Sequence, residues 1–172
     1  EGFGFDTRSV YWYNKHDNTI QQINMNYRHN GLNLFATYKF SDATWMQKAT
    51  YNQTVHVDTL WQQHNNNEVT GRIESHRLIS GFSYDFNANH SIGARYTLTS
   101  PGYSCSKDFF DSQVTADGKF YDYIKTDGLT VDKNNPSHQL NAYYNGIWGK
   151  TTIDLNTDLY FSTNRAYAYS DE

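Results

Sequence analysis

The chain has 172 residues, enough for one domain, and its formal net charge of −4 lacks the basic footprint of a nucleic-acid-binding protein. Its mean hydropathy of −0.82 would suit a disordered chain, but 17% of its residues are aromatic, and disordered chains are poor in aromatic residues. Many Asn, Thr and Ser residues with only two prolines favour long paired strands, so we expect an all-β protein.

Alternation of apolar and polar residues predicts the strands of the first part of the chain, at residues 2–13, 19–29 and 32–40. In the third of these, Leu34, Ala36 and Tyr38 share one side of an extended strand, because strand side chains alternate with period two. The dipeptide Asn30-Gly31 stands just before this strand and is a strong hairpin signal.

The alternation fades after Phe40, and we expect two long loops, at about 41–75 and 100–136. Between and after them it returns in four further strands, at 78–86, 91–98, 139–148 and 152–161. Short turns at 87–90 and 149–150 connect the strands of each later pair. Within the second loop, Asp117-Gly118 and Asp127-Gly128 predict tight turns, so that loop is expected to carry its own hairpin.

The order of these connections is the most informative feature of the sequence. Seven antiparallel strands in a meander would place the short turns at one end of the sheet and the long loops at the other. Transmembrane β-barrels have this asymmetry, with apolar side chains toward lipid and polar side chains toward a wet lumen. A water-soluble antiparallel sheet with one buried face would show the same alternation and stays open as the alternative.

Three stretches carry a resemblance to a known family: QINMNYRHNGLNLFATYKFS at 22–41, NANHSIGARYTLTS at 87–100 and DKNNPSHQLNAYYNGIWGKTTIDLNTDLYF at 132–161. In order and spacing they resemble the early barrel of TonB-dependent receptor-like outer-membrane proteins of the Bacteroidetes type. The resemblance implies a location in the bacterial outer membrane and an incomplete barrel segment spanning residues 1–172. The rest of such a protein would supply further strands and a plug domain.

The resemblance also implies a function and partners. Such a receptor imports a scarce nutrient, such as a metal chelate, an oligosaccharide or a peptide, and an inner-membrane energy-coupling complex opens its plug. Strand parity then predicts charged side chains that face the lumen and contact plug or solute: Arg8, Arg28, Lys39, Arg95, Asp154 and Asp158. The two long loops carry aromatic residues that could contact a ligand: Trp45, Trp61, Tyr103, Tyr121 and Tyr123.

No catalytic or cofactor-binding motif occurs, so we expect neither an enzyme nor a bound cofactor or metal. The single cysteine, Cys105, excludes an intramolecular disulfide. The alternative to a transporter segment is a soluble or surface-anchored β-sheet module that does not transport and binds through its aromatic loops. The two hypotheses differ in what covers the apolar strand faces: lipid in the first, and the protein's own core in the second.

Overall fold

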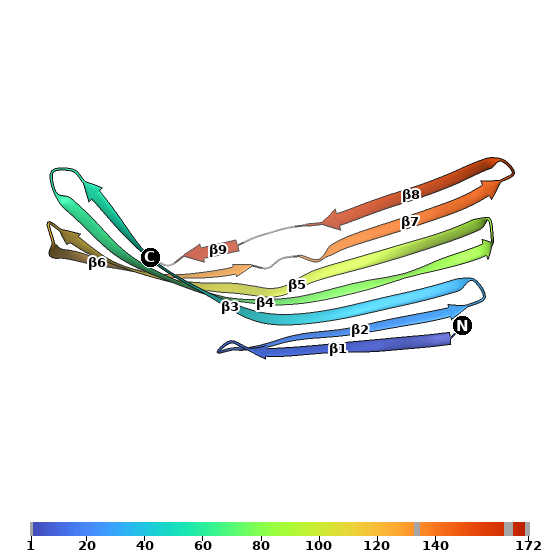
Figure 1. The fold of residues 1–172 in the computed structure, drawn as a ribbon, viewed down its shortest axis with the longest axis horizontal. Helices are drawn as coiled ribbons and strands as arrows, with labels where there is room; N and C mark the ends of the chain where they lie inside the picture. Colours follow the sequence, from blue (N-terminus) through green and yellow to red (C-terminus); the bar gives the residue numbers. More distant parts are fainter. Residues whose placement is uncertain (1, 133–134, 164–166, 171–172) are drawn as a thin grey trace. The chain divides into compact units, whose positions relative to one another are not determined.

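The computed structural model describes residues 2–132, 135–163 and 167–170, and every regular element among them is a β-strand (Figure 1). The expectation of an all-β chain is confirmed. In chain order the strands are β1 (Gly2–Tyr13), β2 (Asp17–His29), β3 (Leu32–His56), β4 (Leu60–Asn87), β5 (His90–Ala116), β6 (Lys119–Asp132), β7 (Ser137–Trp148), β8 (Thr151–Ser162) and β9 (Tyr167–Ser170).

The strands form one antiparallel sheet in the order β1-β2-β3-β4-β5-β6-β9, with β7 and β8 on a branch. The branch arises on β5, whose residues 90–99 pair with β7 and whose residues 104–116 pair with β6. Among the described strands, β1 pairs with β2 alone, β8 with β7 alone and β9 with β6 alone. The described sheet is therefore not closed on itself, and β1 and β8 are the open edges of unit 1.

Turn chemistry explains where the strands reverse. Both residues of Asn30-Gly31 have positive φ, at 45° and 79°, and so do both residues of Asp117-Gly118, at 47° and 76°. Two consecutive positive φ angles define the hairpin turn whose twist matches that of the flanking strands. These two predicted turns are confirmed. The turn predicted at Asp127-Gly128 is wrong, since both residues lie inside β6.

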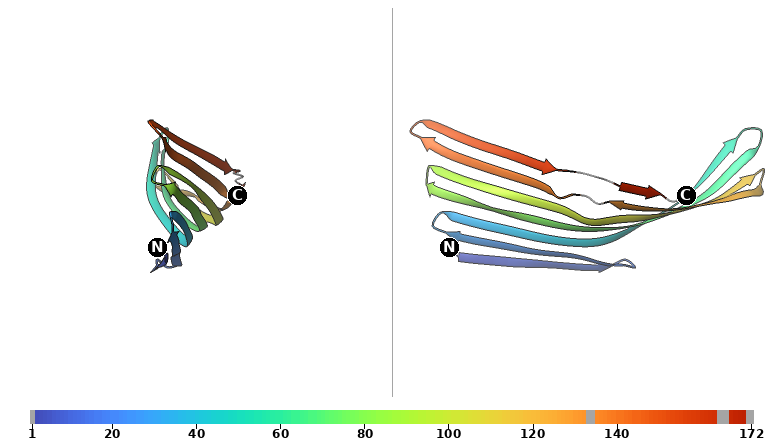
Figure 2. Two further views of the ribbon diagram at one scale, coloured as in Figure 1. Left: turned by 90° about the vertical axis from the view of Figure 1, so that its right-hand side faces the viewer. Right: turned by 180° about the vertical axis from the view of Figure 1, so that it is seen from behind.

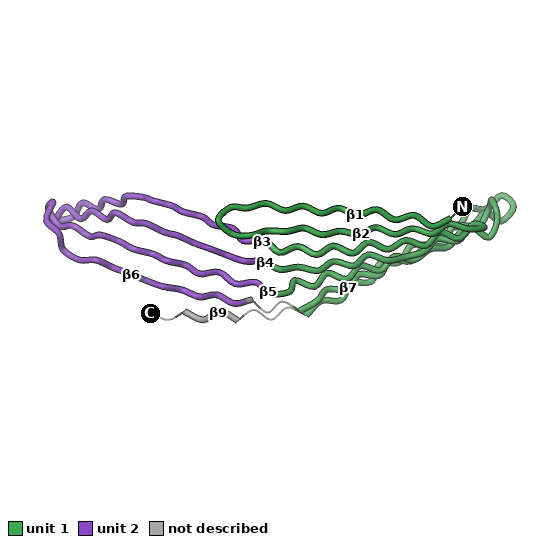
Figure 3. The backbone as a smooth tube through the Cα atoms, turned by 90° about the horizontal axis from the view of Figure 1, so that it is seen from below, with its two compact units in different colours: residues 1–43, 74–102, 134–165 green, residues 44–73, 103–133, 166–172 purple. Residues whose placement is uncertain are grey.

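The chain divides into two compact units, coloured green and purple in Figure 3. Unit 1 comprises residues 1–43, 74–102 and 134–165. Its described strands are β1, β2, β7, β8 and the parts of β3, β4 and β5 that fall in those ranges. These seven segments correspond to the seven strands that the sequence predicted, and Figure 2 shows them side by side.

Three two-residue turns, at 30–31, 88–89 and 149–150, lie together at one end of unit 1 (Figure 1). Two of them are tied to the next strand, because Asp85 N donates to Gly31 O at 3.0 Å and Ile147 N donates to Asn89 O at 2.9 Å. The chain leaves unit 1 after residues 43 and 102 and returns at 74 and 134. The predicted alternation of short and long connections is therefore confirmed from β2 onward, while the short turn at 14–16 between β1 and β2 lies at the opposite end of unit 1.

Unit 2 comprises residues 44–73, 103–133 and 166–172 and corrects the prediction of two long loops. The ranges expected as loops, 41–75 and 100–136, are mostly strand: β3 and β4 extend to a turn at 57–59, and β5 and β6 to the turn at 117–118. Residues 133–134 of the second range lie outside the described residues. The strands were missed because polar side chains occupy both of their faces, so no apolar period marks them.

The count of about seven strands is corrected for the same reason. The described chain has eight strands of twelve or more residues, the additional one being β6, and the four-residue β9.

Hydrophobic burial is almost absent from the described residues. The one buried apolar side chain is Val114, which is 7% exposed and lies in unit 2. In unit 1, large apolar side chains stay open, as illustrated by Phe5 at 69% and Leu155 at 59% exposure. A sheet in water normally buries one face against another layer. The described residues supply no such layer for unit 1.

Candidate functional site

The strand register gathers most of the large apolar side chains of unit 1 on one side of the sheet, which we call the apolar face. Tyr27 pairs with both Phe3 and Leu34, and Leu140 pairs with both Tyr96 and Leu159. The large members of this face are Phe3, Phe5, Tyr11, Tyr13, Ile23, Met25, Tyr27, Leu32, Leu34, Tyr38, Phe40, Leu78, Phe82, Tyr84, Phe86, Ile92, Tyr96, Leu98, Leu140, Tyr144, Trp148, Ile153, Leu155, Leu159 and Phe161.

Charge is separated between the two faces except at one end of unit 1. The charged side chains within the described strands of unit 1 lie on the opposite side, which we call the polar face: Asp6, Arg8, Arg28, Lys39, Arg77, Asp85, Arg95, Asp154 and Asp158. The exceptions, Asp17, Asp42 and Glu74, all lie at the end of unit 1 away from the three short turns. The middle of the apolar face therefore carries no charge among the described residues.

Tyrosine and histidine side chains pair toward both ends of the apolar face. Tyr38 Oη lies 2.7 Å from His76 Nδ1, and Tyr96 Oη lies 2.7 Å from His138 Nδ1. At the end with the short turns, Tyr144 Oη lies 2.9 Å from His90 Nδ1 and accepts from Trp148 Nε1 at 3.0 Å. Each pair combines a large apolar ring with a polar tip, which suits a boundary between apolar and wet surroundings.

On the polar face, the register brings together some of the charged residues predicted from strand parity. Arg8 pairs with Gln22, which pairs with Lys39, so two cations flank one amide in a single row. Phe40 contacts His76 on the opposite side of the sheet, at 5.1 Å between ring centroids. This contact places Lys39 beside Arg77, which extends the row to a third cation.

The other predicted residues of this face are more dispersed. Arg95 pairs with Asn141, which pairs with Asp158, and Asn141 Nδ2 donates to the Asp158 carboxylate at 2.9 Å. Arg28 pairs with Gly2 on β1 and with Asn33 on β3, away from that row. Asp154 pairs with Asn145 and lines a separate hollow near the short turns.

One pocket of about 260 Å³ opens on the polar face of unit 1. Its lining consists of Arg77, Arg95, Thr97, Gln139, Asn141 and Asp158. Two of these residues, Arg95 and Asp158, were predicted, and Arg77 was missed because the expected strand began at residue 78. Extending the alternation of Leu78, Ser80 and Phe82 backward by one residue would have placed Arg77 on the polar side.

The five aromatic residues expected to contact a ligand all lie in unit 2, on strands. Trp61 packs against Tyr121 edge to face, with ring centroids 4.8 Å apart. The Trp45 indole lies across Gly71 of the neighbouring strand. Lys125 Nζ lies 5.2 Å from the centre of the Tyr123 ring. These contacts account for part of the surface of each ring, and ligand contact stays a prediction.

Tyr103 is the fifth of these aromatic residues and lies next to the single cysteine. A hydrogen bond with Cys105 raises the pKa of the Tyr103 hydroxyl, as does the charge that the thiol can carry, while the Arg72 guanidinium acts in the opposite direction. The Tyr103 side chain is exposed. This arrangement therefore favours a neutral phenol at physiological pH.

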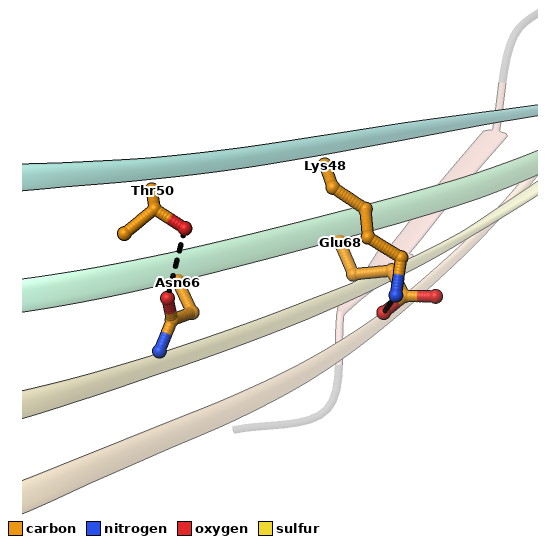
Figure 4. A network of polar contacts seen from close by, with 4 residues as sticks. All are labelled: Lys48, Thr50, Asn66 and Glu68. Carbon is orange, nitrogen blue, oxygen red and sulfur yellow. Dashed lines mark hydrogen bonds and ion pairs between the residues drawn. The ribbon is translucent and has the colours of Figure 1, made fainter.

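Polar side chains also form a ladder across unit 2, part of which Figure 4 draws. Lys48 forms an ion pair with Glu68, and Thr50 Oγ1 donates to Asn66 Oδ1 at 3.0 Å. Asn66 Nδ2 in turn donates to Asp111 on β5 at 3.0 Å. The ladder joins three strands through their side chains in addition to their backbones, so it stiffens this face of unit 2.

Two features are absent from the described residues. They contain no helix, and therefore no helix that could cross a membrane. No group of three or more His, Cys, Asp or Glu side chains is placed to hold a metal ion in the part of the chain that the structure describes. Comparisons with family models, with curated proteins and with solved structures give no match.

Proposed function

We propose that this chain is part of an outer-membrane receptor and transporter barrel that resembles the TonB-dependent nutrient importers. The observation that supports the proposal is the apolar face of unit 1, which is uncharged in its middle and uncovered by any described residue. A face of this size exposed to water would be an aggregation hazard, whereas lipid covers it at no cost.

The dimensions of the apolar face agree with this proposal. On β4 it runs from His76 to Phe86, and about ten residue steps of about 3.3 Å span about 33 Å along the strand. A tilt of about 40° reduces this to about 25 Å, the usual height of the apolar band of an outer-membrane barrel. The aromatic pairs at the two ends then lie at the levels of the lipid headgroups.

The open edges of the sheet support a role as one part of a larger barrel. In this proposal β1 and β8 pair with further strands of the same protein, which satisfies the backbone groups along both edges. The polar face lines the lumen and meets the plug domain or the solute. By resemblance, energy for opening the plug comes from an inner-membrane complex.

Two serines on β4 provide a direct test of the lipid-facing side. Ser80 lies on the apolar face, and Ser83 lies three residues further on the polar face. In a Cys105→Ser background, Ser80→Cys and Ser83→Cys each introduce one thiol with almost no change in volume. The protein at its native length is labelled with bimane at each thiol and reconstituted into liposomes that carry nitroxide on the acyl chains.

We expect strong quenching of the Ser80→Cys label and weak quenching of the Ser83→Cys label. A water-soluble quencher should act in the opposite order if the lumen is wet. Equal quenching at both positions would contradict the membrane proposal. A protein that is monodisperse in buffer without detergent, with both labels inaccessible to lipid, would support the alternative of a non-transporting β-sheet module.

A further inference from the structure

The five cations on the polar face of unit 1 form no ion pair among the described residues. Arg8, Arg28, Lys39, Arg77 and Arg95 take part in none of the ion pairs or side-chain hydrogen bonds of that part of the chain. Three of them fall in one row across β1, β3 and β4. Like charges on neighbouring strands lower the stability of a sheet. An anion that neutralises them would therefore stabilise the folded protein when it binds.

The pocket on this face combines the guanidinium groups with groups suited to hydroxyls. Arg77 and Arg95 line it together with Gln139, Asn141, Thr97 and Asp158. Thr97, at 8% exposure, is the buried member of this lining. Side-chain amides can donate to and accept from a hydroxyl group at once, and a carboxylate accepts from one.

Two aromatic rings lie near Arg95 on the same face, outside the lining of the pocket. The Phe35 ring reaches to 2.6 Å from the position that a Cβ would take at Gly81, and Arg95 lies on the other side of that glycine. The Tyr143 ring lies across Gly93, two residues before Arg95 on the same face. Both rings are half-buried, so each keeps an accessible surface against which the apolar side of a sugar ring can pack.

We propose that the polar face of unit 1 binds an acidic oligosaccharide. Arg77 and Arg95 bind the carboxylate of one sugar unit, and Asn141, Gln139 and Asp158 bind hydroxyl groups. Lys39 and Arg8 extend the positive row for the carboxylates of the units that follow. This inference rests on the proposed function, since it makes the lumen-facing side the place where the solute is recognised.

The Asp158 carboxylate lies in the same pocket and disfavours a second carboxylate beside it. Asn141 donates to it at 2.9 Å and also donates to Asn156 Oδ1 at 2.8 Å, which holds both groups in place. A ligand that carries both hydroxyl and carboxylate groups satisfies the two guanidinium groups and Asp158 together. A simple inorganic anion would leave Asp158 facing like charge, which favours a sugar acid over phosphate or sulfate.

The test measures binding of trigalacturonate to the detergent-solubilised protein at its native length by isothermal titration calorimetry. The fully methyl-esterified trisaccharide has the same rings without charge, and a pentaglutamate peptide has charge without sugar rings. We expect measurable binding of trigalacturonate that weakens with salt, and much weaker binding of both comparison probes. Arg77→Gln and Arg95→Gln should each weaken binding by about 10- to 100-fold, the usual effect of losing a charge-assisted hydrogen bond.

Lys150→Gln is the matched control, since it removes one positive charge at the β7–β8 turn, outside the pocket. Its affinity should equal that of the unchanged protein. No binding of trigalacturonate, or equal binding of its methyl ester, would overturn the proposal. Tighter binding of pentaglutamate with the same dependence on Arg77 and Arg95 would also overturn it, in favour of an acidic polypeptide. The bimane test on β4 is independent of these results, so the two proposals can fail separately.

Discussion

At the scale of single residues, Asp117 joins the tips of the two hairpins of unit 2. Its carboxylate accepts from Leu60 N at 2.9 Å, and its own N donates to Leu60 O at 2.9 Å. Asp117 also has a φ of 47°, a region that Asp and Asn tolerate better than most residues. One side chain thus supports both a turn and a contact between hairpins.

We expect Asp117→Ala to loosen these tips, because it removes the bond to Leu60 and places a poorly suited residue at positive φ. The combined cost should be about 1–3 kcal/mol of local opening free energy, measured by hydrogen exchange at the Leu60 amide. Asp117→Asn keeps an acceptor oxygen and should behave nearly as the unchanged protein. Asp127→Ala, at an Asp-Gly pair within a strand, should leave exchange at Leu60 unchanged; a similar increase there would contradict the role given to Asp117.

At the scale of elements, the glycines of two turns in unit 1 differ in their surroundings. Gly31 has a φ of 79°, and a Cβ added to it would lie 2.7 Å from the backbone oxygen of Asp85 on β4. Gly149 has a φ of 64° and nothing within 4 Å of the corresponding position. Both turns need a residue at positive φ, but the first also brings a backbone from the next hairpin close to the turn.

Gly31→Ala should therefore destabilise the protein more than Gly149→Ala does. The cost of positive φ alone is about 1 kcal/mol, which we expect for Gly149→Ala. The contact with Asp85 should raise the loss for Gly31→Ala to about 2 kcal/mol or more, measured as the free energy of unfolding in denaturant. Equal losses would mean that the Asp85 backbone moves aside freely.

At the scale of the whole molecule, the sequence predicted those strands whose two faces differ. Leu34 and Asn33 alternate in polarity, so unit 1 could be read from period two alone, and Asn30-Gly31 marked its turn. Residues 44–73 could not be read in this way, since Lys48 and Thr50 make one face of β3 polar while Gln47 and Gln53 interrupt the other. The turn predicted at Asp127-Gly128 was wrong because Gly128 takes an ordinary strand conformation opposite Asp108.

The candidate site was predictable only in part, for a related reason. Parity along one strand puts Arg95 and Asp158 on the polar face. Which residues of different strands lie side by side depends on the register between the strands. The register of β4 against β3 follows a hairpin whose turn, at 57–59, the sequence did not reveal. The Tyr38–His76 pair and the place of Arg77 beside Lys39 both depend on that register, and so neither could be derived from the sequence.

The separation of charge between the two faces leads to a prediction for the membrane proposal as a whole. Ala36 and Thr37 are neighbours in the middle of the unit 1 part of β3, on the apolar and polar faces respectively. A charged side chain near the middle of a bilayer costs about 2–4 kcal/mol on the lipid-facing side of a barrel. Ala36→Arg should lower the free energy of unfolding in lipid vesicles by about that amount.

Thr37→Arg introduces the same side chain one residue away, toward the proposed lumen, and should cost about 1 kcal/mol or less because water reaches it. The two variants share length, charge and strand, and Thr37→Arg in addition loses the hydrogen bond from Thr37 Oγ1 to Asn24 Oδ1 at 2.9 Å, so a smaller loss for Thr37→Arg reports the effect of the lipid. The difference between the two variants should also vanish in a water-soluble sheet that is left open on both sides. A larger loss for Thr37→Arg than for Ala36→Arg would mean that the polar face is the one buried in apolar surroundings, and the proposed orientation would be reversed.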